Sequence, residues 1–317
     1  MADEWLVMEV ARRAIEAEGI VSLVLTAADG RPLPPAEAGA HIDVDVGPGL
    51  IRQYSLCGNP ADDSHYRLGV LLEAASRGGS AGMHRGAGVG ERLRVRPPRN
   101  TFPLHEASPF SLFLAGGIGV TPLMSMAYRL HELDRPFDLQ YCVRSRSRAA
   151  FADELVSGPF GAAVTLNLDD ESNGGAGPIA ALERAPPGTH AYICGPSGFI
   201  DAMVVAATKA GYEAERRHVE RFTIVPQAED SFMVVAARRG IEVEVGPDKT
   251  IADALIDAGI DVQLSCEAGV CGTCLTRVIE GLPDHRDQFQ TDQEKAVGGQ
   301  MTICCSRSFS PRLVLDV

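Results

Sequence analysis

The spacing of hydrophobic and polar positions changes twice along this 317-residue chain. Up to about residue 104, short alternating stretches such as 66–70 lie between turns rich in Gly and Pro, a pattern typical of a small antiparallel barrel. From Phe110 onward, apolar strands alternate with segments of helical spacing, which indicates a parallel sheet with crossover helices. After residue 231, two strand-like segments and a helix lead into a cysteine-rich loop. The pattern predicts three modules.

The predicted elements set the bounds of these modules. Strands of the second module are expected over 110–115, 137–143, 164–168 and 191–194, and its helices over 121–133, 149–156 and 197–210. The third module is expected to open with strands over 232–237 and 241–245 and a helix over 250–258. Because 223–231 is polar and contains proline, it resembles an inter-domain linker. We therefore expect domains over 1–104, 105–224 and 232–317, with a linker over 225–231.

Composition and charge narrow the class of protein. With 45% hydrophobic and 22% charged residues, the chain is expected to fold as a globular protein. Its net charge of -13 argues against nucleic-acid binding. No apolar run reaches the ~20 residues of a membrane helix, and residues 1–10 lack the basic patch and apolar core of a signal peptide. We expect a cytoplasmic protein that binds neither nucleic acid nor membranes.

Five of the eight cysteines lie in the last 52 residues, which is unlike a disulfide framework and typical of a metal site in a reducing compartment. Cys266, Cys271 and Cys274 have the C-x4-C-x2-C spacing of plant-type ferredoxins. A fourth thiolate from the distant pair Cys304 and Cys305 would complete the ligands of a 2Fe-2S cluster.

Two features favour iron and sulfide at this loop. Gly269 and Gly272 would let backbone N–H groups approach the sulfurs closely and stabilise the reduced cluster. The alternative is zinc, but zinc sites usually combine two short-spaced ligand pairs, whereas this chain has one triplet and a remote cysteine. The sequence therefore predicts an iron–sulfur site.

Two glycine-bearing turns predict a dinucleotide crevice. Thr121 and Pro122 are expected to be the N-cap and the first residue of the helix after the first turn. Glycines there would bring a diphosphate close to the free N–H groups of that helix. A second such turn ends a later strand, and ligands of open α/β sheets bind at the carboxyl ends of strands. A structural turn without a ligand is the alternative. The turn residues are Gly116, Gly117 and Gly119 in the first and Cys194, Gly195 and Pro196 in the second.

Asp169 and Asp170 follow the strand predicted over 164–168. A carboxylate at this position would accept hydrogen bonds from an adenosine ribose and repel a 2′-phosphate, which favours NADH over NADPH. A solvated acidic loop explains either residue equally well.

The barrel module carries candidate flavin-binding residues. In 52–56, Arg52 offers a guanidinium for a phosphate, Tyr54 a ring that packs on a flat ligand, and Ser55 a hydroxyl for flavin N5 or O4. Strand alternation places Ser55 on the face opposite to Arg52 and Tyr54. The segment Arg77-Gly78-Gly79-Ser80 is suited to a backbone nest for one phosphate, although an ordinary loop is as good an explanation.

These motifs stand in an order that resembles the phthalate dioxygenase reductase family, which includes the reductases of vanillate demethylases. The resemblance spans essentially the whole chain and includes 98–104 (PRNTFPL) at the domain border and 218–222 (HVERF) at the end of the nucleotide domain. It implies an FMN-binding antiparallel β-barrel, a parallel α/β domain that binds NADH, and a β-grasp plant-type ferredoxin domain. It also implies that Phe222 lies near the flavin ring and that Cys304 is the fourth ligand. In the family the corresponding segment is C-V-S-R, where this chain has Cys304-Cys305-Ser306-Arg307.

The resemblance implies a reductase component that passes electrons from NADH through FMN to the cluster, and then to a separate terminal Rieske-type oxygenase. The chemistry is carried by cofactors, so no catalytic acid or base is expected. We expect a monomer. Two alternatives remain: a stand-alone diaphorase that reduces quinones or ferric chelates, and a redox-sensing regulatory protein.

Overall fold

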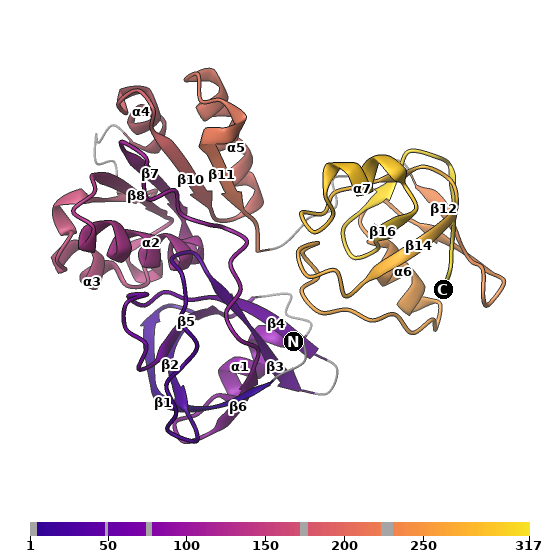
Figure 1. Cartoon of the computed structure of the whole chain (residues 1–317), viewed down its shortest axis with the longest axis horizontal. Coiled ribbons are helices and arrows are strands. Elements are labelled where there is room, and N and C mark those ends of the chain that lie inside the picture. Colours follow the sequence, from indigo (N-terminus) through magenta and orange to yellow (C-terminus); the bar gives the residue numbers. More distant parts are fainter. Residues whose placement is uncertain (1–4, 48–49, 74–77, 172–176, 223–230) are drawn as a thin grey trace. The chain divides into compact units, whose positions relative to one another are not determined.

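The computed structural model describes residues 5–47, 50–73, 78–171, 177–222 and 231–317. The chain divides into two compact units, Met1–Phe222 and Thr223–Val317. Each unit has its own hydrophobic core, and each is described by itself below (Figure 1). None of the helices in the described ranges is both long enough and apolar enough to cross a membrane.

The first unit begins with a six-stranded antiparallel sheet. In the order β4-β3-β6-β1-β2-β5 its strands are Leu50–Ser55, His41–Gly47, Arg92–Val95, Leu6–Ala17, Ile20–Ala27 and Tyr66–Leu71. A bridge between Leu56 and Leu68 joins the β4 and β5 ends of this sheet, so the sheet curves into a barrel. Alternate residues such as Met8 and Val10 fill its interior and are fully buried. The short helix α1, Gly79–Gly86, packs against β3, β4 and β5.

A five-stranded parallel sheet completes the first unit. Its order is β11-β10-β7-β8-β9, with bounds Arg217–Glu220, His190–Cys194, Ser111–Gly116, Phe137–Val143 and Val164–Leu168. Helices α2 (Val120–Glu132), α3 (Ala152–Ser157), α4 (Gly177–Arg184) and α5 (Ser197–Lys209) cover it. All six residues of β7 are buried, as expected for a central parallel strand with helices on both faces.

The strand period of two divides the core of this sheet into two layers. Phe113 and Ala115 of β7 pack with α2 and α3, whereas Leu112 and Leu114 pack with α4 and α5. The α2 layer also includes Ile20 from the barrel. A shared core therefore holds the barrel against the α2 face of the sheet, which explains why both belong to one compact unit.

The second unit is a mixed sheet crossed by a helix. Its order is β13-β12-β18-β14-β16, with bounds Ile241–Val245, Phe232–Ala236, Arg312–Leu315, Leu275–Glu280 and Gln300–Thr302. Only the β12–β18 pair is parallel, which matches a β-grasp arrangement. Helix α6 (Ile251–Asp257) begins at a capping box formed by Thr250 and Asp253. The shorter elements are β15 (Pro283–Asp284), α7 (Asp292–Val297) and β17 (Arg307–Ser308).

The predicted fold class is confirmed: a barrel, a parallel α/β sheet and a ferredoxin-like module follow one another along the chain. Predicted strands agree with the observed ones to within one residue. Helix α4 was not predicted, and α3 begins at Ala152, three residues later than expected. The boundary between the first two domains stays a prediction, because both lie in one compact unit.

Candidate functional site

The two glycine turns lie side by side at the carboxyl edge of the parallel sheet. Strands β7 and β10 are neighbours, with Ala115 paired to Cys194. A Cβ atom on Gly119 would lie 2.4 Å from the carbonyl carbon and oxygen of Cys194, and one on Gly195 would lie 2.9 Å from the Cα of Gly116. The backbones of the turns are therefore in direct contact, and only glycine allows this approach.

Each turn is followed at once by a 13-residue helix, α2 after the first and α5 after the second. Neither helix has a side chain that caps its first turn, because the N-cap residues are Gly119 and Pro196. The Val120 N–H donates within the preceding 3-10 turn, but no side chain competes with an anion at either N-terminus, and the helix dipoles favour negative charge there. The edge of the sheet fits a diphosphate.

The expected cap of α2 is wrong. The helix begins at Val120, so Thr121 and Pro122 are its second and third residues, and Gly119 is the N-cap. The Thr121 hydroxyl donates to the Ile118 carbonyl oxygen at 2.9 Å, and its side chain is buried. The short 3-10 turn over Gly117–Gly119 explains the earlier helix start, since it leads directly into α2 before Thr121.

Strand ends from the barrel and the sheet meet at Ser55, Glu220 and Cys194. Ser55 closes β4, Glu220 closes β11, and β11 pairs with β10 so that Glu220 is opposite Cys194. The Ser55 hydroxyl donates to Glu220 Oε2 at 3.4 Å. Burial raises the pKa of Glu220 to about 8, against the opposing effect of the Ser55 hydrogen bond. The pKa of the Cys194 thiol is raised by burial and further by the Glu220 carboxylate.

Glu220 was not identified as a site residue from the sequence. Its place inside the 218–222 motif was the available signal, but the motif alone does not show that β11 ends beside Ser55. Phe222 follows two residues later and is 39% exposed. A large apolar ring with this exposure next to a polar cluster fits one wall of a site for a flat ligand.

The other flavin candidates also come together in the barrel. The Arg52 side chain packs on Gly79, where a Cβ atom would lie 2.7 Å from Arg52 Nε. Gly78, at the N-cap of α1, has a φ of 98°, a conformation that favours glycine. Ser80 Oγ accepts a hydrogen bond from the Glu73 amide at 3.0 Å. Arg77 lies outside the described residues.

Tyr54 is the next flavin candidate on β4. Its ring packs against the buried cluster of the barrel, and burial raises the pKa of its hydroxyl to about 12. The predicted alternation along β4 is observed, because Tyr54 packs on the barrel core while Ser55 contacts Glu220 of the parallel sheet.

Asp169 and Asp170 are exposed and follow β9, the edge strand, with β8 between them and the first glycine turn. Their amides donate to the carbonyl oxygens of Val143 and Arg144 just past the end of β8. Burial raises the pKa of Cys142 to about 12, and the Asp169 carboxylate adds to this effect. Since Cys142 pairs with Gly116, the aspartates share the edge that carries the turns.

Four thiols come together in the second unit, three from the cysteine loop and the fourth from Cys304. The Cys304 thiol lies beside those of Cys266 and Cys274, and Cys266 also lies beside Cys271. The neighbouring Cys271 and Cys304 thiols and the amides of Ala268 and Val270 lower the pKa of Cys266. Thiols that adjoin one another and accept N–H bonds fit a cluster of thiolate-bound iron.

Cys305 takes a different position. Its Sγ lies next to Gly269, where a Cβ atom would be 2.6 Å away, and near Thr302 Oγ1 at 3.1 Å. The Cys305 thiol adjoins the Cys304 thiol. Gly269 and Gly272 have φ of 70° and 74°. A Cβ on Gly272 would overlap the Phe289 ring at 2.3 Å, so glycine is required at both positions.

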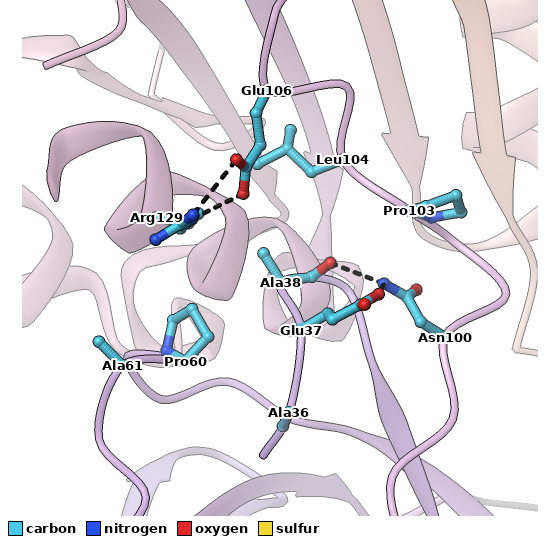
Figure 2. Close-up of a pocket in the computed structure, with 10 residues that line it drawn as sticks. All are labelled: Ala36, Glu37, Ala38, Pro60, Ala61, Asn100, Pro103, Leu104, Glu106 and Arg129. Carbon is cyan, nitrogen blue, oxygen red and sulfur yellow. Dashed lines mark hydrogen bonds and ion pairs between the residues drawn. The ribbon is translucent and has the colours of Figure 1, made fainter. Parts of the chain in front are cut away.

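A separate pocket of about 430 Å³ lies in the first unit between Ala36–Ala38, Pro60–Ala61 and the border segment. Figure 2 shows Glu106 paired with Arg129 on one side and Asn100 bonded to Glu37 and the Ala38 carbonyl oxygen on the other. None of the residues predicted to bind flavin or nucleotide lines it. It is therefore distinct from the cofactor candidates.

Comparison with known proteins agrees with this arrangement. Residues 234–308 match the family model of the 2Fe-2S iron-sulfur cluster binding domain. A vanillate O-demethylase oxidoreductase of Pseudomonas sp. (strain HR199) is 47% identical over 307 residues, which cover 95% of this chain and 96% of that protein. A tetrachlorobenzoquinone reductase of Sphingobium chlorophenolicum is 42% identical over 311 residues, 95% and 94% of the two chains.

A solved structure matches the whole chain as well. The structure of phthalate dioxygenase reductase, described as a modular structure for electron transfer from pyridine nucleotides to [2Fe-2S], shares 34% identity. The match covers 99% of this chain and 98% of the chain in that structure, with a TM-score of 0.75. The chain therefore belongs to the phthalate dioxygenase reductase family of oxidoreductases and carries a C-terminal 2Fe-2S domain.

Proposed function

We propose that this chain is the NADH-dependent reductase component of a two-component oxygenase system and delivers electrons to a separate Rieske-type oxygenase that acts on an aromatic or other small substrate. The observation that carries the proposal is that the nucleotide edge, the barrel with its Arg52–Gly79 contact, and the cluster of four thiols occur in one chain. The full-length similarity to an O-demethylase oxidoreductase supports it.

The proposed nucleotide site is the edge formed by the two glycine turns. Gly116, Gly117 and Gly119 admit the diphosphate to the N-terminus of α2, with Thr121 and Pro122 in the first turn of that helix. Cys194, Gly195 and Pro196 form the opposite wall, since Cys194 and Gly195 abut Gly119 and Pro196 abuts Gly116. The exposed carboxylates of Asp169 and Asp170 favour NADH, because they would repel a 2′-phosphate.

The proposed flavin site lies between the barrel and the sheet. Arg52, Gly78, Gly79 and Ser80 are suited to the FMN phosphate, and the resemblance adds Arg77. Tyr54 and Phe222 offer aromatic surfaces, and Ser55 presents its hydroxyl beside Glu220. When bound, FMN accepts a hydride with two electrons and releases the electrons one at a time.

In the second unit, Cys266, Cys271, Cys274 and Cys304 are the proposed ligands of the 2Fe-2S cluster. The surrounding amides, such as Ala268 N–H at 3.4 Å from Cys266 Sγ, would stabilise negative charge on the sulfurs.

The charge of the ferredoxin domain would contribute to docking on the oxygenase. Residues 232–317 contain 8 Lys and Arg and 13 Asp and Glu, a net charge of -5. An acidic ferredoxin domain would be steered toward a basic patch on the oxygenase. We further propose a monomer in the cytoplasm, where a reducing environment would keep the cysteine loop from forming disulfides.

A quinone reductase is the second candidate, and the 42% identity to a tetrachlorobenzoquinone reductase favours it. Anaerobic stopped-flow reduction by NADH distinguishes the two. The reduced protein is mixed with a Rieske-type oxygenase or with tetrachlorobenzoquinone. Reoxidation by the oxygenase within one turnover supports the proposal; reoxidation by the quinone alone would replace it with the second candidate.

A further inference from the structure

Three histidines meet in the first unit, away from the nucleotide edge. His105 lies in the connection between β6 and β7, His190 is the first residue of β10, and His218 is in β11. One ring nitrogen from each of them lies within 4.8 Å of the other two. Histidine nitrogens that converge from three segments are the donor set of zinc and related ions.

The geometry is close to that of a metal site. His190 Nδ1 and His218 Nε2 are 2.9 Å apart, and their rings are nearly parallel at 13°. Two nitrogens on one tetrahedral zinc lie roughly 3.4 Å apart, given Zn–N bonds of about 2.05 Å. The pair is therefore near the required separation. The His105 side chain is exposed, so it has room to turn toward the other two.

The surroundings hold the pair in place. His218 stacks on Tyr192 with ring centroids 4.4 Å apart, and the Tyr192 hydroxyl accepts a hydrogen bond from the His105 amide at 2.8 Å. The charge of Arg216, which lies near His190, opposes a cation, but Glu213 pairs with it at 3.6 Å.

We propose that His105, His190 and His218 form a binding site for one divalent transition-metal ion of the zinc class, with a fourth position open to water. His190 is at the amino end of β10, four residues or roughly 13 Å from Cys194 at the nucleotide edge. The ion would therefore touch neither flavin nor nucleotide. It would link the β6–β7 connection, which carries His105, to strands β10 and β11.

The test uses the full chain with flavin and cluster in place. Zn²⁺ alone is titrated by calorimetry into the wild type, His105→Ala and His131→Ala, and iron and labile sulfide are measured before and after. His131 is an exposed histidine on α2 outside the trio, so it is the matched control. We expect one Zn²⁺ per wild-type chain, with binding weakened at least tenfold in His105→Ala, because even outer partners of a metal site contribute roughly 10–100-fold.

His131→Ala should bind Zn²⁺ as the wild type does. Saturating Zn²⁺ should raise the Tm of the wild type and of His131→Ala but not that of His105→Ala. NADH–ferricyanide turnover checks that His105→Ala is folded. His190→Asn is a second variant of the histidine trio and is titrated in the same way. Equal Zn²⁺ binding by the wild type and both trio variants, or wild-type binding weaker than roughly 1 mM, would overturn the proposal and leave a stack of neutral histidines.

Discussion

The Ser55 hydroxyl donates a hydrogen bond to Glu220, and this bond joins the last residue of barrel strand β4 to the last residue of sheet strand β11. The two residues are 165 positions apart in the chain. The carboxyl group retains its proton to about pH 8 because it is buried. A protonated, hydrogen-bonded carboxyl at the junction of the flavin and nucleotide candidates has consequences for stability that can be measured.

Glu220→Gln should change how stability depends on pH. The pKa of Glu220 is raised from 4.5 to about 8 on folding, so between these pH values the folded state binds more protons than the unfolded state. Stability is therefore lost as pH rises through this window, by at most about 1.4 kcal/mol per pH unit. The glutamine variant has no proton to lose and should lack that slope.

Urea unfolding from pH 5 to 8 measures this effect, followed by the fluorescence of Trp5, the single tryptophan, which reports on the first unit. The control is Glu183→Gln, an exposed glutamate on α4. Parallel curves for the wild type and Glu220→Gln would show that Glu220 is ionised at neutral pH.

Gly119→Ala should separate the two glycine turns. The new methyl group would lie 2.4 Å from the Cys194 carbonyl, and such overpacking costs typically 1–3 kcal/mol. We expect reduced stability and a KM for NADH raised about tenfold or more. Gly86→Ala, at the end of α1 and away from the glycine turns, adds a methyl group that meets no other segment within 4 Å; it is the matched control and should behave as the wild type. A wild-type KM in Gly119→Ala would remove the turn from the nucleotide site.

Cys304→Ser should lose most of the cluster, because this thiol adjoins both Cys266 and Cys274. Cys305→Ser should keep it, since Cys305 packs on Gly269 and Thr302 instead. Iron and labile sulfide content, with EPR of the dithionite-reduced variants, measures the outcome. Loss of the cluster in Cys305→Ser alone would show that the ligand is the second cysteine of the pair.

A double variant, Asp169→Ser with Asp170→Ser, should relax the preference for NADH. Without the two exposed carboxylates, the repulsion of a 2′-phosphate disappears. We expect the ratio of kcat/KM for NADH to that for NADPH to fall roughly tenfold, which corresponds to about 1.4 kcal/mol. An unchanged ratio would mean that the adenosine ribose binds elsewhere along the edge.

Residues 1–222 alone should fold and remain an NADH–flavin module, because they form one compact unit with their own cores. The fragment should reduce ferricyanide at a rate close to that of the full chain. It should fail to reduce cytochrome c efficiently or to support an oxygenase, since all four proposed cluster ligands lie beyond residue 222. Oxygenase turnover at the full rate by the fragment would make the flavin the direct donor.

Local spacing was enough to predict much of this protein. The continuous apolar run of β7 and the strands over 137–143 and 164–168 depend on burial along a strand, so they can be predicted from the chain. The cysteine spacing is also local, because three thiols on one loop must lie near one another. Even so, the N-cap of α2 was misplaced by two residues, since a 3-10 turn over Gly117–Gly119 competes with the threonine cap.

Contacts between distant segments were decided only by the tertiary structure. The spacing of residues does not show that β11 pairs with β10, which brings His218 to His190, or that the barrel packs on the sheet so that Ser55 meets Glu220. The same holds for the two buried cysteines near the C-terminus, where the direction of each side chain separates Cys304, beside the thiols of Cys266 and Cys274, from Cys305, against Gly269. Burial then shifts the pKa values of Glu220 and His218, because desolvation depends on the whole surrounding fold.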